Sequence, residues 1–170
     1  MSNIVLIGFM GSGKTTVAKT LSKSKNMVFI DTDIMLASIF DTTIPLFIEK
    51  FGIKTFRYFE YFIVSFLSVY CINSPFKYVI STGGGIVLNS ENKDKLSRIG
   101  KIFWLDSNPK ILWSRVSKKL NKRPLLNQSN SPQDTYFLLY KERKHLYKDF
   151  SDYRLDLTSV PFFKISSLFT

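Results

Sequence analysis

A glycine-rich segment close to the N-terminus has the residue types of a phosphate-binding loop. Residues 8–15 read Gly-Phe-Met-Gly-Ser-Gly-Lys-Thr, which fits the spacing G-x-x-x-x-G-K-[ST] between an apolar run and a helical pattern. In such a loop the backbone N–H groups surround phosphate oxygens, the lysine offsets negative charge and the last hydroxyl can ligate Mg²⁺. A simple glycine turn would need neither Lys14 nor Thr15. The residues expected to bind nucleotide phosphates are Gly11, Ser12, Gly13, Lys14, Thr15 and Thr16.

Two aspartates follow the second apolar run of the chain. Asp31 and Asp33 come directly after residues 27–30, at the strand end where open α/β sheets bind their ligands. One carboxylate could hold Mg²⁺ through water while the other accepts a proton from a substrate hydroxyl. The alternative is that Asp31 or Thr32 only caps the next helix. Capping needs one side chain, so the pair favours a functional site.

Three further features are weaker when each is taken alone. Gly83, Gly84 and Gly85 end the third apolar run, and a backbone without Cβ atoms can approach a small ligand closely. Arg57 lies three residues before Glu60, a spacing that suits an ion pair, although an arginine against an aromatic helix face could also be aimed at an anion. Taken singly, the arginines at positions 123 and 143 are expected to be solvated.

The elements that must position these residues alternate short apolar runs with longer amphipathic stretches. This pattern is typical of an α/β protein in which helices cover a parallel sheet. We expect strands at residues 3–7, 27–30, 77–82, 101–105 and 153–157. We expect helices at residues 14–24, 44–51, 55–71 and 133–150. Two more are expected, one that ends at residue 40 and one that begins near residue 109. The polar segment 121–131 is expected to be a mobile loop. The apolar residues 61–72 are too few to span a membrane and are expected to form a buried helix.

Composition narrows the class of protein. The 170 residues fit one domain, and 45% hydrophobic residues can form a core. One cysteine and one histidine cannot build a disulfide or a four-ligand zinc site, which favours a cytoplasmic protein. The net charge of +11 suits anionic partners, but the lysines are spread over the expected helix faces. We therefore expect a solvated basic surface, no nucleic-acid partner and no membrane segment.

Taken in order, six motifs resemble those of the shikimate kinases. They are the phosphate loop at 8–15, Asp-Thr-Asp at 31–33, Phe-Arg-x-x-Glu at 56–60, Thr-Gly-Gly-Gly at 82–85, Arg-Pro-Leu-Leu at 123–126 and Glu-Arg-x-x-x-Tyr at 142–147. The resemblance runs from about residue 3 to residue 156, nearly the whole chain. The phosphate loop is common to many kinases, whereas the other five motifs in this order are specific.

The resemblance implies an ATP:shikimate 3-phosphotransferase with a nucleoside-monophosphate-kinase-like fold. That fold is a three-layer α/β/α sandwich with a five-stranded parallel sheet, here one domain over residues 1–170 with a mobile lid at about 118–132. By the same resemblance the phosphate loop and Lys14 hold ATP, Thr15 ligates Mg²⁺ and Asp31 supports the ion through water. Asp33 would bind the substrate hydroxyls and act as base. The shikimate carboxylate would be held by Arg57, Arg143 and the backbone of Gly83, Gly84 and Gly85, and Arg123 would reach the transferring phosphoryl group.

The chain departs from the family pattern in its tail, and other functions remain open. The residues after 156 look short for an adenine-contacting loop and a final helix. A second possibility is another small-molecule kinase with the same phosphate loop, such as a gluconate or nucleotide kinase. A third is a non-catalytic or nucleic-acid-binding protein that uses the positive charge. We expect the protein to be a monomer that binds ATP and shikimate.

Overall fold

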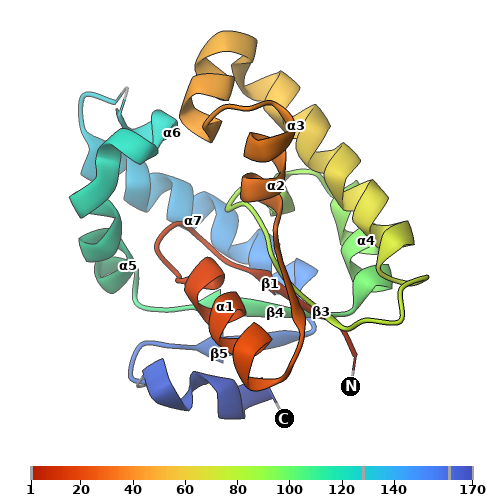
Figure 1. Ribbon diagram of the computed structural model, residues 1–170. Coiled ribbons are helices and arrows are strands. Elements are labelled where there is room, and N and C mark those ends of the chain that lie inside the picture. Colours follow the sequence, from red (N-terminus) through yellow and green to blue (C-terminus); the bar gives the residue numbers. More distant parts are fainter. Residues whose placement is uncertain (1, 128, 161, 170) are drawn as a thin grey trace.

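Five parallel strands form one sheet in the order β2-β3-β1-β4-β5 (Figure 1). The strands are β1 (Ile4–Ile7), β2 (Val28–Asp31), β3 (Tyr78–Ser81), β4 (Lys101–Asp106) and β5 (Tyr153–Asp156). The computed structural model describes residues 2–127, 129–160 and 162–169. Because β1 lies in the middle, the loop that follows it is flanked by the ends of β3 and β4. The five-stranded parallel sheet confirms the predicted fold class.

Helices cover both faces of the sheet. They are α1 (Lys14–Ser24), α2 (Thr32–Ile39), α3 (Ile44–Tyr70), α4 (Glu91–Ile99), α5 (Pro109–Val116), α6 (Pro124–Asn127) and α7 (Pro132–Phe150), with 3₁₀ helices η1 (Ile86–Leu88), η2 (Ser117–Lys122) and η3 (Phe162–Phe169). Successive strand residues point to opposite faces. In β1, Ile4 and Leu6 therefore pack with α1 and η3, whereas Val5 and Ile7 pack with α3, α4 and α7.

The long helix α3 is interrupted at one glycine. Gly52 has φ 80° and ψ 161°, a backbone conformation that L side chains rarely adopt. Two helical segments meet at this residue, as the sequence predicts with separate helices at 44–51 and 55–71. At this break the helix changes direction. The first segment lies over α2, and the second segment, which carries Arg57 and Glu60, runs in a different direction.

The structure differs from the sequence predictions of secondary structure in three places. The segment 121–131 is not an irregular loop, because it contains the end of η2 and the turn α6, where Leu126 is fully buried; residue 128 of the expected lid lies outside the described residues. The tail does form a last helical element, η3, which places Ile165 and Phe169 against α1. Helix α4 was not expected, since only Leu96 and Ile99 mark its buried side among charged residues.

The second half of α3 is also less buried than predicted. Ile63, Val64 and Leu67 face the core, but Phe62 and Val69 on the opposite side are exposed. The reason is that no element among the described residues covers α3 on its outer side (Figure 1). Within the part of the chain that the structure describes, no helix is long and apolar enough to cross a membrane.

Candidate active site

The phosphate loop joins β1 to α1 and is wedged between neighbouring elements. Gly11 and Gly13 have φ of 85° and 84°, which only glycine adopts readily. A Cβ atom on Gly11 would also lie 2.6 Å from the carbonyl oxygen of Leu112 in α5. The spacing of glycines that predicts the loop therefore has two physical causes, backbone conformation and close packing. Ser12 is buried beneath the loop, whereas Thr16 lines the cavity above it.

Lys14 folds back over this loop. Its Nζ donates hydrogen bonds to the carbonyl oxygens of Gly8 at 2.7 Å and Phe9 at 3.2 Å. Burial, followed by the nearby positive charge of Arg123, lowers the pKa of Lys14 to about 8. Two positive groups are thus held close together at a place built for anions.

The hydroxyl of Thr15 joins two strand ends. Its Oγ1 donates a hydrogen bond to Asp31 Oδ2 at 2.8 Å and lies 3.3 Å from the Oγ of Ser81. The other oxygen of Asp31 accepts from the backbone N–H groups of Asp33 and Ile34, so this side chain also caps α2. The sequence analysis missed Ser81, which reaches this place because β2 and β3 are paired with Asp31 opposite Ser81.

Two carboxylates meet beside the first glycine of the triplet. A Cβ atom on Gly83 would lie 2.7 Å from Asp33 Oδ1 and 2.7 Å from Glu60 Oε1. Burial, followed by the charge of Asp31, raises the pKa of Asp33, while Lys14, Arg123 and Arg57 act in the opposite direction. The close approach explains why a residue without a side chain stands at position 83.

Glu60 has a larger part in the site than the sequence indicates. It is buried, and its Oε2 accepts a hydrogen bond from Arg57 Nη1 at 2.6 Å, the predicted ion pair. Its other oxygen has no hydrogen-bond partner among the described residues. Burial is the main cause that raises the pKa of Glu60, and the charge of Arg57 opposes it. Glu60 therefore fixes Arg57 and presents a free oxygen near Gly83.

The predicted arginines converge on one small cavity. It is lined by Asp33, Arg57, Glu60, Gly83, Gly84, Gly85, Arg123 and Arg143, from five separate parts of the chain. Arg143 of α7 is buried, which lowers its pKa, and its guanidinium lies 6.0 Å from the ring centre of Phe9. A Cβ atom on Gly85 would overlap the guanidinium of Arg57. Taken singly, Arg123 and Arg143 were expected to be solvated and Arg57 to pair with Glu60; the fold brings all three arginines to one cavity.

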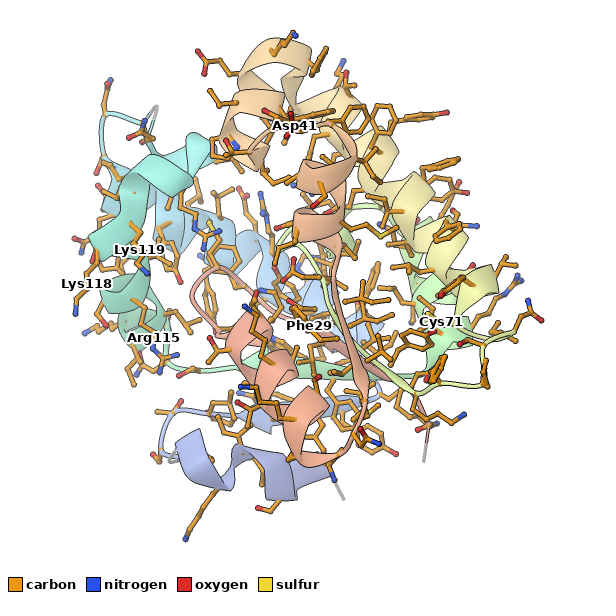
Figure 2. The ribbon with its side chains drawn as sticks, viewed as in Figure 1. Phe29, Asp41, Cys71, Arg115, Lys118 and Lys119 are labelled. Carbon is orange, nitrogen blue, oxygen red and sulfur yellow. The ribbon has the colours of Figure 1, made fainter. Side chains whose placement is uncertain are left out.

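A second cavity, of about 1300 Å³, adjoins the first. It is lined by residues of the phosphate loop and by Asp31, Asp33, Arg115, Lys119 and Arg123. Asp33 and Arg123 line both cavities, so they lie where the two spaces meet. Arg115 was not predicted; its Nη1 donates to the carbonyl oxygen of Gly11 at 3.2 Å, and it lies with Lys119 at the edge of α5 and η2 (Figure 2).

Helix α7 ties the loops of the two cavities together. The hydroxyl of Tyr136 donates to the carbonyl oxygen of Met10 at 3.0 Å, and the hydroxyl of Tyr147 donates to that of Gly84. Both rings also pack edge-on against Phe9. The phosphate loop, the glycine triplet and Arg143 thus share one support. Tyr147 belongs to a motif noted in the sequence, whereas nothing in the sequence distinguishes Tyr136.

The parallel sheet, the phosphate loop and the adjoining second cavity define a P-loop kinase. A family model described as shikimate kinase matches residues 10–163. The shikimate kinases of Thermoanaerobacter pseudethanolicus and Pelotomaculum thermopropionicum are 36% and 38% identical over 94% of this chain, covering 89% and 88% of those proteins. The chain therefore belongs to the shikimate kinase family, whose members are phosphotransferases with an alcohol acceptor.

Solved structures agree with this assignment. A shikimate kinase from Acinetobacter baumannii in complex with shikimate superposes with a TM-score of 0.86 at 28% identity, covering 99% of this chain and 88% of that one. A gluconokinase from Sinorhizobium meliloti gives a TM-score of 0.55 at 14% identity, over 98% of this chain and 87% of that one, which shows the shared fold alone.

Proposed function

We propose that this chain transfers the γ-phosphoryl group of ATP to the 3-hydroxyl of shikimate, giving 3-phosphoshikimate and ADP. The observation that carries the proposal is the small cavity next to the phosphate loop. It offers the Asp33 carboxylate at the junction with the nucleotide cavity and two guanidinium groups deeper inside, that of the buried Arg143 and that of the half-buried Arg57. This arrangement matches an acceptor that has a hydroxyl group at one end and a carboxylate at the other.

The two deep arginines would hold the acceptor's carboxylate. Guanidinium groups bind carboxylates through paired N–H donors, which fixes the plane of the ligand as well as its position. Arg57 is oriented by Glu60 at 2.6 Å, and Gly85 leaves room for its guanidinium. The backbone at Gly83, Gly84 and Gly85 closes the same wall of the cavity. The acceptor would thus be positioned with its hydroxyl groups toward Asp33.

Asp33 would accept the proton from the attacking hydroxyl. It lies at the junction of the two cavities, and burial raises its pKa toward the range in which a general base works well near neutral pH. Lys14 and Arg123 flank it and would offset negative charge on the transferring group. We assign Asp33, Lys14 and Arg123 as the catalytic residues on these grounds.

Oxygen donors at the start of α1 suit a magnesium ion. The Thr15 hydroxyl and the Asp31 carboxylate are hydrogen-bonded at 2.8 Å, with the Ser81 hydroxyl beside them. Mg²⁺ prefers such oxygen ligands and keeps several waters, so Thr15 as a ligand and Asp31 as a support through water fit its chemistry. When bound, the ion would neutralise charge on the β- and γ-phosphate oxygens.

Residues near 118–132 would act as the lid. Arg123 and Leu125 line the acceptor cavity from this segment, and the side chain of Leu126 anchors it to the core. Closure of such a segment excludes water and protects ATP from hydrolysis. With a single cysteine the chain cannot form an intramolecular disulfide, which is what an oxidising compartment would favour. We therefore place the reaction in the cytoplasm.

The test is an ADP-release assay with a panel of acceptors. The purified enzyme is given ATP and Mg²⁺ with shikimate, quinate, gluconate, AMP or no acceptor. We expect rapid ADP release with shikimate and background rates with gluconate and AMP. Faster turnover of AMP or gluconate than of shikimate would refute the assignment and favour a nucleotide or gluconate kinase.

A further inference from the structure

The outer side of the second half of α3 is an exposed apolar surface. Seven large side chains between residues 58 and 76 have exposed fractions of 48–64%. We call them the outer face; they are Tyr58, Phe62, Phe66, Val69, Tyr70, Ile72 and Phe76. Figure 1 shows α3 along the edge of the molecule, with α2 and α4 on its inner side. The face is continuous along the helix and the turn that follows it.

This helix is apolar all round. Phe56, Ile63, Val64 and Leu67 are buried on the side opposite to the outer face. A helix with apolar side chains on all sides is normally covered on all sides, whereas a surface helix has a polar outer face. The sequence accordingly predicts a buried helix here, and the single chain leaves half of it in water. The outer face was predicted to be buried and is exposed in the single chain, which indicates that another molecule covers it.

Charged groups are absent from the outer face. Among residues 58–76 the sequence contains one charged residue, Glu60, and its side chain is buried in the active site. The chain as a whole carries a net charge of +11, so surfaces that carry its lysines and arginines would repel the same surfaces of a second copy. Two copies can therefore meet at the outer face without bringing charged side chains of residues 58–76 into contact.

The outer face also has the shape of a docking surface. A groove of about 700 Å³ runs beside the end of α3, lined by Phe62, Phe66, Val69, Tyr70 and Phe76. The rings of Phe66 and Tyr70 are stacked with their centres 5.5 Å apart, so part of the groove wall is already ordered. A partner's aromatic side chain would fill this groove with little loss of freedom on the receiving side.

The area is close to what a dimer needs. Large aromatic side chains present about 150–250 Å² each, so seven large side chains that are about half exposed offer roughly 700 Å². Patches on monomers seldom exceed about 300–600 Å², and a standard interface buries about 800 Å² per partner. The outer face with a narrow rim around it therefore reaches the standard size.

We infer that the outer face binds the same face of a second copy of this chain, in a two-fold symmetric dimer with the two α3 helices packed against each other. A two-fold axis places identical patches in contact, which suits a face that is apolar throughout. A helix that lies on anionic lipid carries Lys and Arg beside its apolar side, and residues 58–76 carry none. The dimer replaces the monomer that was expected at the outset.

The active sites stay open in this dimer. Arg57 and Glu60 point from α3 toward the glycine triplet, on the side of the helix opposite to the outer face. Cys71, at the end of α3, and Arg115, at the nucleotide cavity, lie on opposite sides of the molecule (Figure 2). Dimer formation and catalysis can therefore be measured separately.

Sedimentation velocity of the full chain over about 1–100 μM is the experiment that tests the dimer. We expect the wild type to sediment as a dimer in the micromolar range, and Phe62→Glu and Val69→Glu to raise the dissociation constant at least about 100-fold, because each places two like charges near the two-fold axis. Leu138→Glu is the matched control, since Leu138 on α7 is also 58% exposed but lies outside the face. Circular dichroism and turnover of shikimate establish that each variant is folded, and we expect both to be unchanged.

A charge-complementation experiment tests the symmetry. Val69→Glu mixed with Val69→Lys should restore a dimer that neither variant forms alone, which supports contact between two copies of the same face. A wild type that stays monomeric at 100 μM would overturn the inference. It would be overturned equally if the Glu variants dimerised as tightly as the wild type, or if the monomeric wild type bound anionic vesicles through this face.

Discussion

Replacing the three glycines of residues 83–85 by alanine, one at a time, tests the acceptor site with a single methyl group. The added Cβ atom at Gly85 would overlap the guanidinium of Arg57, and at Gly83 it would lie 2.7 Å from Asp33 Oδ1. At Gly84 the nearest atom would be 3.6 Å away, an ordinary contact. None of the three has a left-handed backbone, so alanine adds no backbone strain. Gly84→Ala is therefore a matched control for its two neighbours.

The expected size of the effect follows from the contact that is lost. In Gly85→Ala the guanidinium of Arg57 must move away from Glu60, its partner at 2.6 Å, and from the wall of the acceptor cavity. A hydrogen bond to a charged group is worth about 1.5–3 kcal/mol, which corresponds to roughly a 10- to 150-fold rise in the KM for shikimate. The KM for ATP should change less than about two-fold, because the phosphate loop is untouched. Gly83→Ala should instead lower kcat, since it displaces Asp33.

The assay measures ADP release while shikimate is varied at saturating ATP, and then ATP at saturating shikimate. Thermal unfolding of each variant is the control for the fold; the flexible ends of Arg57 and Glu60 can move aside, so we expect the melting temperature to change little. The reasoning is refuted if Gly85→Ala leaves the KM for shikimate unchanged. It is also refuted if Gly84→Ala is as damaging as Gly85→Ala.

Four further variants test other parts of the site. Arg143→Lys keeps the charge but loses the paired donors, so the KM for shikimate should rise about ten-fold with little change in that for ATP, measured in the same assay. Asp33→Asn should lower kcat steeply while ATP binding stays normal, whereas Asp31→Asn should recover activity at raised Mg²⁺; identical profiles would contradict the assigned roles. The pKa of Lys14 is about 8 in the free protein, and bound phosphates favour the charged form, so ATP binding at pH 8.5 should take up a proton and weaken as the pH rises further. Calorimetry in buffers of different ionisation enthalpy measures that uptake, and Lys14→Met should abolish it.

The elements that the sequence predicts best are those fixed by local rules. The helix expected at residues 14–24 begins and ends where α1 (Lys14–Ser24) does, because the glycine loop sets its start. The break in α3 was expected between 51 and 55 and occurs at Gly52. In both places the backbone conformation depends on glycine, which can be recognised without knowledge of the rest of the fold.

The residues that were missed take their roles from the register of the sheet and the packing of helices. Ser81 joins Thr15 because β2 and β3 pair with Asp31 opposite Ser81, and a sequence does not show which strands are neighbours. Tyr136 reaches Met10 across 126 positions of sequence. The outer face of α3 illustrates the same limit, since an apolar helix predicts burial without showing what buries it.

Asp31 shows that two roles predicted as alternatives can belong to the same side chain. A capping role and a role in the site were alternatives when the side chain was treated as a single group. In the structure Oδ1 accepts the N–H groups of Asp33 and Ile34, while Oδ2 accepts the hydroxyl of Thr15. The cap fixes the carboxylate, because two hydrogen bonds to one oxygen leave the other little freedom. The helix start therefore orients Oδ2 toward the phosphate loop, and the capping role supports the role in the site that we propose for Asp31.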